Sequence, residues 1–197
     1  MTDAWASKRL VYRAVEKGDH DALLKTLDSD AESFINISSA LPAPLGKKDM
    51  EEYYEYLQKK LLAVAICLPA PPVSNTQDGG TPPQPIPIGV ISLEEIPARH
   101  HQHRGSEIAV NVVKEYRGKG YGTEAIEWAL DWGFEYAGLH RIGIVAFAYN
   151  AGAVRLYERM GFAREGVKRD CIYSKGRFWD VVLLSMLEEE WRARGKK

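Results

Sequence analysis

The sequence has little cysteine and no long hydrophobic run, and each absence argues against a class of protein. Cys67 and Cys171, the two cysteines among 197 residues, lie far apart. No disulfide framework is implied, and we expect two buried, reduced thiols. Neither lies in a motif that would activate it as a nucleophile. No segment approaches the roughly 18 apolar residues of a membrane span, and the start MTDAWASKRL contains no apolar signal segment. We therefore expect a cytoplasmic protein without a membrane partner.

An excess of charge of either sign is also missing. The chain carries 26 Lys and Arg against 27 Asp and Glu, a formal net charge of −1. Nucleic-acid-binding proteins usually show a strongly basic face, so we expect no nucleic-acid partner. His100, His101 and His103 stand close together in a polar segment without a nearby cysteine or a spaced partner, which makes them weak metal ligands. We expect a surface loop there and no metal site; a contribution to the substrate site is the alternative.

The remaining composition is typical of a globular protein, with 45% hydrophobic residues. We expect a single domain over 1–197, in which the proline-rich segment 69–87 is an exposed loop inserted into a hairpin and 188–197 is a tail or short helix. Segment 31–46 is expected to be a loop. The periodicity of apolar residues predicts strands at 9–13, 61–68, 88–93, 107–113, 141–148, 163–174 and 177–187, and helices at 22–27, 49–60, 123–137 and 150–160. This order predicts a mixed α/β fold with a curved central sheet.

The most informative segment is a glycine-rich turn between a strand and a helix. It reads Arg117-Gly118-Lys119-Gly120-Tyr121-Gly122-Thr123. The three glycines allow positive φ and close approach to a ligand, and free N–H groups at a helix start form an anion site. Arg117 and Lys119 would add positive charge, and Thr123 a hydroxyl. The turn therefore favours a pyrophosphate, although neither a Walker loop nor the dinucleotide fingerprint matches; a turn without a ligand is the alternative.

This turn resembles the Arg/Gln-x-x-Gly-x-Gly/Ala motif of the GNAT superfamily of N-acetyltransferases. A second block, Asn150-Ala151-Gly152-Ala153-Val154-Arg155-Leu156-Tyr157-Glu158-Arg159-Met160-Gly161-Phe162, resembles that family's Asn-x-x-Ala-x-x-Leu-Tyr-x-x-x-Gly-Phe helix. The resemblance extends from about Ser7 to Leu187, and its outer patterns are similar to the branch of ribosomal-protein N-terminal and spermidine acetyltransferases. The proline-rich insertion and Lys114, where many relatives carry proline, depart from the family pattern.

The resemblance implies a curved, mostly antiparallel sheet flanked by helices, with splayed central strands forming an acetyl-CoA cleft. Val110 and Val112 would pair with the pantetheine arm, and a backbone N–H near Val112 would polarise the thioester carbonyl. The amides of residues 117–122 would hold the pyrophosphate. Asn150 would contact the arm or fix the second strand; it is equally suited to cap a helix.

The resemblance also implies direct attack of a neutral primary amine on the thioester. Tyr157 matches the family tyrosine that protonates the leaving thiolate; its alternative is a tyrosine packed on a helix face. Glu107 is the first choice for the general base, because the same branch carries a glutamate there. An exposed or ion-paired carboxylate is its alternative.

The acceptor implied is a small amine such as a polyamine, or the N-terminus of a protein. The acidic helix from Asp49 to Glu55 would either attract a polycation or be a solvated face. A non-catalytic acyl-CoA-binding or sensing module is the alternative function, and the proline-rich loop is also suited to bind SH3-type grooves. The sequence does not fix an oligomeric state, and a homodimer is compatible with it.

Overall fold

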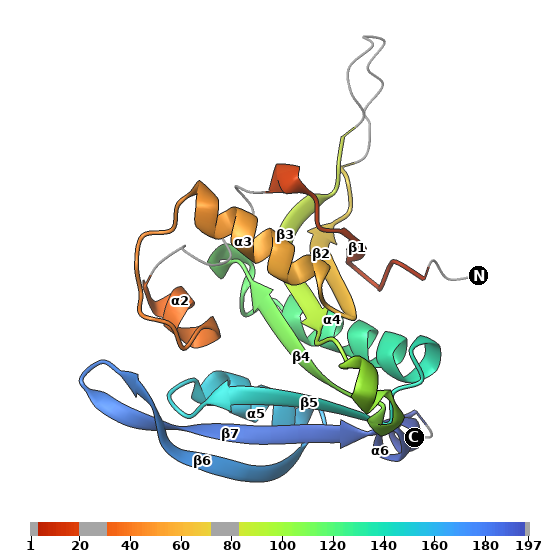
Figure 1. Ribbon diagram of the computed structural model, residues 1–197. Helices are drawn as coiled ribbons and strands as arrows, with labels where there is room; N and C mark the ends of the chain where they lie inside the picture. Colours follow the sequence, from red (N-terminus) through yellow and green to blue (C-terminus); the bar gives the residue numbers. More distant parts are fainter. Residues whose placement is uncertain (1–3, 20–30, 72–82, 196–197) are drawn as a thin grey trace.

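The computed structural model describes residues 4–19, 31–71 and 83–195. A sheet of seven strands in the order β1-β2-β3-β4-β5-β7-β6 forms its centre (Figure 1). The strands are β1 (Val11–Ala14), β2 (Leu62–Leu68), β3 (Ile86–Leu93), β4 (Gly105–Val112), β5 (Arg141–Phe147), β6 (Ala163–Ser174) and β7 (Arg177–Leu187). The helices are α2 (Ala31–Ile37), α3 (Lys47–Gln58), α4 (Tyr121–Asp131), α5 (Ala151–Arg159) and α6 (Glu188–Arg194), with short turns η1 (Lys17–Asp19), η2 (Ala98–His103), η3 (Lys114–Tyr116) and the π-helical η4 (Trp132–Tyr136). Within the described ranges, none of these helices is long and apolar enough to cross a membrane.

Neighbouring strands are antiparallel except for β4 and β5 at the centre. These two run parallel and pair only from Gly105 opposite Arg141 to Glu107 opposite Gly143. Beyond that point β4 stays paired with β3, and β5 stays paired with β7, so the two halves of the sheet diverge (Figure 1). The helix α2 lies at the open end of the resulting V.

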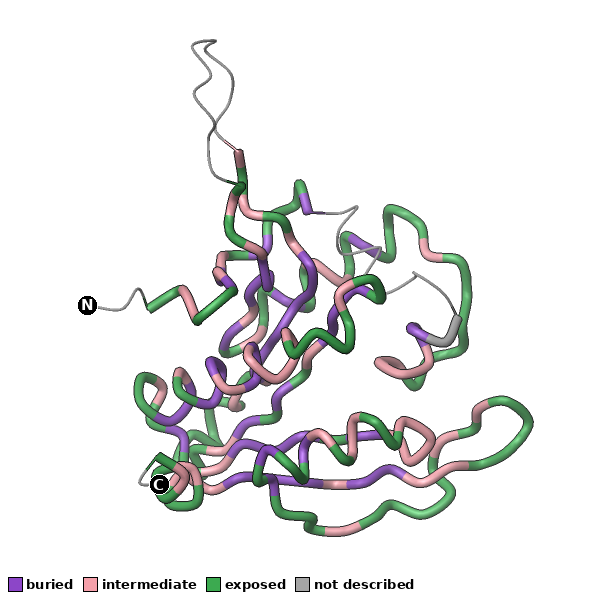
Figure 2. The backbone as a smooth tube through the Cα atoms, turned by 180° about the vertical axis from the view of Figure 1, so that it is seen from behind, coloured by how far each residue is buried: buried purple, intermediate pink, exposed green. Residues whose placement is uncertain are grey.

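The apolar core lies on both faces of the sheet. On one face, α4 and α5 pack against β3, β4 and β5 through a large cluster that includes Ile126, Ile108 and Ile142. On the other face, Met50 and Leu57 of α3 pack against β2 and β3. Figure 2 shows the buried positions along these elements and the exposed ones along β6. Burial on two faces explains why β2 and β3 are almost continuously apolar.

The outer strand β6 behaves differently from the central strands. Most of its residues are exposed, and its pairing with β7 shifts register between Arg164 and Gly166 and again between Lys168 and Ile172. Asp170, within the second shift, adopts a positive φ of 48°. The strand is therefore bent and loosely matched to its neighbour.

Most of the elements expected from the sequence are confirmed, with some differences. The expected loop at 31–46 is wrong in part, because α2 occupies its first half. The polar connection before β4 contains the 3-10 turn η2, and the helix expected to end at 137 ends as η4, followed by Gly138 at φ 63°. Cys67 is buried, but Cys171 is exposed, contrary to expectation. The expected helix at 22–27 and most of the proline-rich loop lie outside the described residues.

The helix α2 owes its position to contacts from distant parts of the chain. Arg117 Nη1 donates to Ser33 Oγ at 3.1 Å, and the Tyr149 hydroxyl donates to the Ile35 carbonyl. A helix of seven residues has little stability of its own. Because those contacts come from more than 80 residues away in sequence, local periodicity could not reveal the helix.

Gly89 provides a test of how closely β3 and β4 must approach. A Cβ at this position would lie 2.3 Å from the Asn111 carbonyl oxygen and 3.2 Å from Val112 Cα, and backbone atoms cannot rotate away. Gly89→Ala should displace β4 and lower the free energy of unfolding by about 1–3 kcal/mol. Urea unfolding measures this effect. Gly166→Ala on β6, where no heavy atom lies within 4 Å, is the control; equal urea midpoints for the two variants would contradict this account.

Candidate functional site

The V between β4 and β5 exposes one edge of the β4 backbone. The Glu107 carbonyl accepts from Glu94 N at 2.9 Å, and Val113 N donates to the Ile88 carbonyl at 2.8 Å, so both groups point toward β3. Because backbone direction alternates along a strand, Val110 and Val112 direct their N–H and C=O groups away from β3, into the V. Pairing with β5 has already ended at Glu107. An extended ligand could therefore pair with this edge as an additional strand.

The glycine-rich turn continues directly from that edge. Gly118 and Gly120 have φ of 72° and 83°, in the left-handed region that favours glycine. Gly120 precedes the first residue of α4, and the first backbone bond to close inside this helix runs from Glu124 N to the Gly120 carbonyl at 3.1 Å. The N–H groups of 118–123 find no acceptor within the described part of the chain. Six successive donors beside the positive end of a helix form a site for an anion.

The basic side chains of the turn have other partners than expected. Arg117 N donates to the Lys114 carbonyl at 3.1 Å, so this amide, which the resemblance assigns to the anion site, already has an acceptor in the turn. The Arg117 guanidinium donates from Nε to the Val112 carbonyl at 2.7 Å. Lys119 Nζ lies 5.3 Å from the centre of the Tyr116 ring. Arg117 thus ties the turn to the end of β4 and to α2, and the described donors to an anion are mainly backbone groups.

A brace from the N-terminal segment supports the turn, and sequence reasoning missed it. Arg9 Nη1 donates to the Lys119 carbonyl at 2.9 Å, and Arg9 Nε donates to Glu124 Oε2 at 2.7 Å. The Ser7 hydroxyl donates to Glu124 Oε1 at 2.8 Å. Although partial burial by itself would raise the pKa of Glu124, these hydrogen bonds hold it below its ordinary value. No local signal could have paired residues more than 100 positions apart.

Two cavities meet inside the V. The first, of about 460 Å³, lies toward α2 and α3. The second, of about 570 Å³, lies over the glycine-rich turn, α4 and α5 and is lined by Gly118, Gly120, Tyr121, Gly122 and Thr123 among others. They share a wall made of Asn36, Ile37, Val110, Asn111, Asn150, Ala153 and Tyr157. A molecule in one cavity can therefore contact a molecule in the other at this wall.

Tyr157 occupies the shared wall and is 8% exposed. Its hydroxyl has no hydrogen-bond partner among the described residues. Burial raises its pKa to about 12, so the phenol carries its proton at neutral pH and is available as a donor. Spacing along α5 brings Tyr157 to the same region as Ala153, one helical turn earlier.

The other predicted residues divide between the site and its surroundings. Asn150 lies in the shared wall, where its Oδ1 accepts from Ala153 N at 3.2 Å, and it thereby caps α5. Glu107 is exposed, at the closed end of the V, and lines neither cavity. The structure thus brings Tyr157 and Asn150 together with Val110, but it does not bring Glu107 to them.

Two contributions to the cavities were not anticipated. Residues of α2 line the first cavity. This contribution was missed because the segment was expected to be a loop. Arg159 lines the second cavity, and its guanidinium has no partner among the described residues. Helical spacing could have found Arg159, since Gly152, Leu156 and Arg159 lie on one face of α5 and all three line that cavity.

The acidic helix and the histidines contribute little to these cavities. Asp49 is the acidic residue of α3 that lines the first cavity, and its Oδ2 accepts from Gly46 N at 2.7 Å at the helix start. Glu51, Glu52 and Glu55 are exposed. The histidines 100, 101 and 103 are exposed on η2, and in the described ranges no cluster of potential metal-ligating residues occurs.

Comparisons of sequence agree with this geometry. A model of the acetyltransferase (GNAT) domain matches residues 9–163. A spermidine N(1)-acetyltransferase from Vibrio cholerae is 33% identical over 109 residues, which make up 55% of this chain and 61% of that protein. YdaF of Bacillus subtilis, provisionally named a ribosomal N-acetyltransferase, is 36% identical over 103 residues, or 52% of this chain and 55% of that protein. The matches therefore span little more than half the length of these curated relatives.

Comparisons of structure cover almost the whole chain. The spermidine N-acetyltransferase of Vibrio cholerae, solved with CoA and spermine, matches with a TM-score of 0.70 and 25% identity over 94% of this chain and 99% of that one. A GNAT-family acetyltransferase from Bacillus anthracis matches with a TM-score of 0.71 and 24% identity over 93% of this chain and 98% of that one, a likeness of fold. The predicted fold class is confirmed.

The environment of Tyr157 predicts a pH dependence of stability. Its pKa is about 10 in an unfolded chain and about 12 in the folded protein. The unfolded chain therefore loses the proton first, and stability that is complete below about pH 10 is lost as pH rises toward 12, by up to about 3 kcal/mol in all. In urea unfolding between about pH 9 and about pH 11, Tyr157→Phe should lose less stability than the unmodified protein. Tyr136→Phe, at a position 72% exposed, is the control. Identical pH profiles for Tyr157→Phe and the unmodified protein would argue against the buried phenol.

Proposed function

Because the chain belongs to the GNAT family of acetyltransferases, we propose that it transfers an acetyl group from acetyl-CoA to a primary amine. The observation that carries this proposal is the junction of two cavities at Tyr157. One cavity is bordered by free backbone amides that suit a pyrophosphate, and the other is separate from them and suits an acceptor. A shared wall allows the two substrates to react directly.

Acetyl-CoA suits the second cavity in both of its chemical parts. The pyrophosphate would accept hydrogen bonds from the amides of 118–123, and Arg159 would add a cation. The pantetheine amides would pair with the free edge of β4 at Val110 and Val112. The Val112 carbonyl already accepts from Arg117, so its N–H is the group left for the thioester carbonyl. The Vibrio cholerae relative was solved with CoA and spermine, which supports this choice.

The acetyl group passes directly from the thioester to the amine, without a covalent enzyme intermediate. The amine nitrogen attacks the thioester carbonyl, the C–S bond breaks, the nitrogen loses a proton and the thiolate gains one. Tyr157 supplies a hydrogen bond to the developing thiolate. Since its pKa is about 12, complete proton transfer to a thiolate with a pKa of about 8.5 would be uphill. The phenol therefore stabilises the thiolate by donation while the proton lost by the amine completes the reaction.

The general base expected from the resemblance is the Glu107 carboxylate. Glu107 stays a prediction, because its exposed carboxylate lies outside both cavities and would need a water relay to reach the amine. The acceptor is a small amine or a peptide N-terminus, as the names of the relatives suggest. Free Cys67 and Cys171 suit a reducing compartment, so a cytoplasmic location is part of the proposal.

A non-catalytic acyl-CoA-binding module is the alternative. Such a module would need the turn and the edge of β4, but it would need neither a phenol at the junction nor a second cavity. Tyr157 and the acceptor-side cavity therefore favour catalysis. A homodimer stays a prediction.

The turn can be tested with a matched pair of glycine variants. Gly120 and Gly138 both have positive φ, 83° and 63°, so alanine should cost about 1–2 kcal/mol of stability at either position. Only Gly120 belongs to the turn. We expect Gly120→Ala to weaken acetyl-CoA binding at least about tenfold in calorimetry, roughly 1.4 kcal/mol, and Gly138→Ala to bind normally. Normal affinity in Gly120→Ala would remove the pyrophosphate assignment.

Tyr157 can be tested separately from cofactor binding. Tyr157→Phe keeps the ring and removes the donor, so we expect turnover to fall about 10²-fold or more while calorimetry gives an unchanged affinity for acetyl-CoA. Release of CoA thiol measures the turnover. An unchanged rate would exclude the donor role. If neither the unmodified protein nor the variant acetylated any amine, the non-catalytic alternative would be favoured.

A further inference from the structure

We propose that the acceptor carries one ammonium group on an apolar body of about the size of an arylalkylamine, together with a neutral polar group, and that it is not a polyamine. This inference rests on the proposed function and concerns the cavity on the α2 and α3 side of Tyr157. Three properties of that cavity carry it: its charge, its apolar walls and a buried hydroxyl.

Charge is sparse among the described residues that line the cavity. Of the described residues around its 460 Å³, Asp49 alone carries a formal charge at neutral pH, and one of its oxygens already accepts from Gly46 N. A polyamine carries two or more ammonium groups, and each would lose its hydration on entering. One carboxylate can compensate one ammonium group and leaves the others without a partner.

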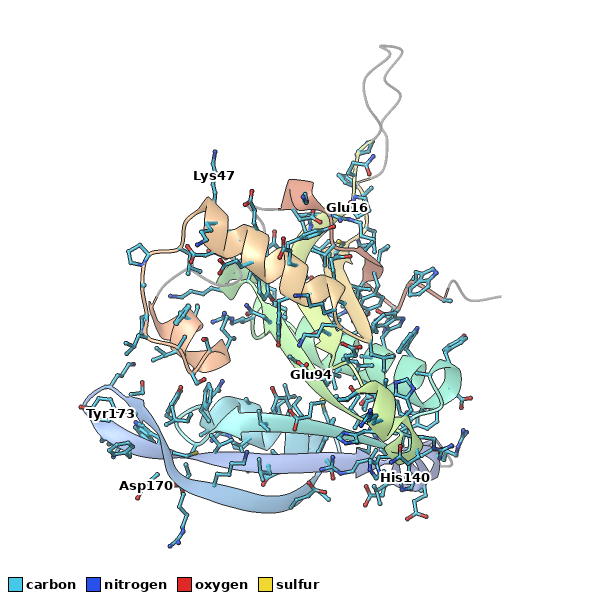
Figure 3. All side chains as sticks on the ribbon, in the orientation of Figure 1. Glu16, Lys47, Glu94, His140, Asp170 and Tyr173 are labelled. Carbon is cyan, nitrogen blue, oxygen red and sulfur yellow. The ribbon has the colours of Figure 1, made fainter. Side chains whose placement is uncertain are left out.

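Nearby carboxylates do not make up the difference. Glu52 is exposed and lies 3.6 Å from Lys48 Nζ. The Glu94 carboxylate is paired with Lys60, whose side chain is 4% exposed, and accepts from the Tyr56 hydroxyl at 3.2 Å. Figure 3 shows Glu94 beside β4. Glu107 does not line the cavity. Among the described residues, these acidic groups near the cavity are therefore paired, exposed or outside it.

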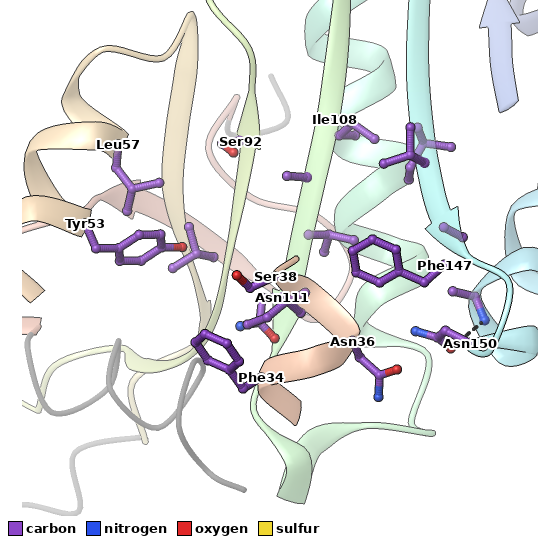
Figure 4. A pocket seen from close by; sticks show the side chains of 18 of the residues that line it. Phe34, Asn36, Ser38, Tyr53, Leu57, Ser92, Ile108, Asn111, Phe147 and Asn150 are labelled. Carbon is purple, nitrogen blue, oxygen red and sulfur yellow. Dashed lines mark hydrogen bonds between the residues drawn. The ribbon is translucent and has the colours of Figure 1, made fainter. Parts of the chain in front are cut away.

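The walls suit an apolar body. Phe34 from α2, Tyr53 and Leu57 from α3, and Phe147 from β5 surround the space between the strands (Figure 4). Pockets of 300–1,000 Å³ with such linings typically bury most of a small ligand. Aromatic faces also attract a single cation as it approaches. The helix α2 lines one side of the cavity and is fastened at Ser33 and Ile35, so that side is obstructed for the rest of a peptide chain.

Ser92 marks where the acceptor presents a neutral polar group. It lies on β3, lines the cavity and is 4% exposed (Figure 4). Its hydroxyl has no hydrogen-bond partner among the described residues. A buried hydroxyl without a partner costs about 1–3 kcal/mol, and a hydroxyl or carbonyl on the acceptor would recover that cost. Tyramine has the required combination of one amine, one ring and one hydroxyl.

Steady-state release of CoA thiol from acetyl-CoA tests the acceptor class. We expect kcat/KM for tyramine to exceed that for spermidine at least about tenfold, and to exceed that for a short peptide with an N-terminal tyrosine. A higher kcat/KM for spermidine or for the peptide would overturn the inference and leave the proposed acetyl transfer intact. No turnover with any amine, together with no calorimetric binding of acetyl-CoA, would overturn the proposed function as well.

Two substitutions test the charge argument. Val145 lines the cavity and is 42% exposed, whereas Val167 on β6 is 39% exposed and lies outside it. Val145→Glu adds a second carboxylate to the cavity, so the ratio of kcat/KM for spermidine to that for tyramine should rise at least about tenfold. Val167→Glu is the matched control and should leave that ratio unchanged. The inference would be overturned if this ratio rose equally in both variants, or if it rose in neither variant.

Ser92→Ala tests the hydroxyl. The unmodified protein should prefer tyramine to 2-phenylethylamine, which lacks the second polar group, by about fivefold or more in kcat/KM, in line with one hydrogen bond. Ser92→Ala should remove that preference without changing the KM for acetyl-CoA. A preference that survives in the variant would overturn the role of Ser92.

Discussion

The structure depends on the short extent of the parallel pairing between β4 and β5, which ends at Glu107 and Gly143. Each strand keeps its other neighbour, so the sheet remains continuous while its two halves separate. The separation leaves the backbone edge of β4 without a strand partner. On its other side, β4 lies so close to β3 that a Cβ at Gly89 would meet the backbone of Asn111 and Val112. Both cavities and the contact between them at Tyr157 follow from the same divergence.

The positive character of the turn comes more from backbone than from side chains. The guanidinium groups of Arg117 and Arg9 are directed at the carbonyls of Val112 and Lys119, so they hold the turn in shape. Its amides remain free for a ligand. Such an arrangement is preorganised, because amides fixed by a helix need no rearrangement to meet an anion. The positive φ of Gly118 and Gly120 favours glycine at these two positions of the turn.

Sequence patterns predicted the parts of the molecule that depend on neighbouring residues. The central strands, the glycine-rich turn and the block from Asn150 to Phe162 are local, and they lie as expected. The errors concern contacts between distant segments. The helix α2 and the brace from Arg9 to Glu124 need partners far along the chain. Exposure of Cys171 follows from the position of β6 at the sheet edge, which periodicity does not reveal.

The irregular edge strand β6 has a consequence for how copies of this protein meet at high concentration. A straight, apolar edge offers unpaired backbone groups to a second molecule and invites growth into fibres. Here two shifts of register bend the edge, and charged residues stand along it at Arg164, Glu165, Lys168, Arg169 and Asp170. A second sheet would meet mismatched spacing and like charges. The cell can therefore accumulate such a chain with little risk of open-ended β polymerisation at this edge.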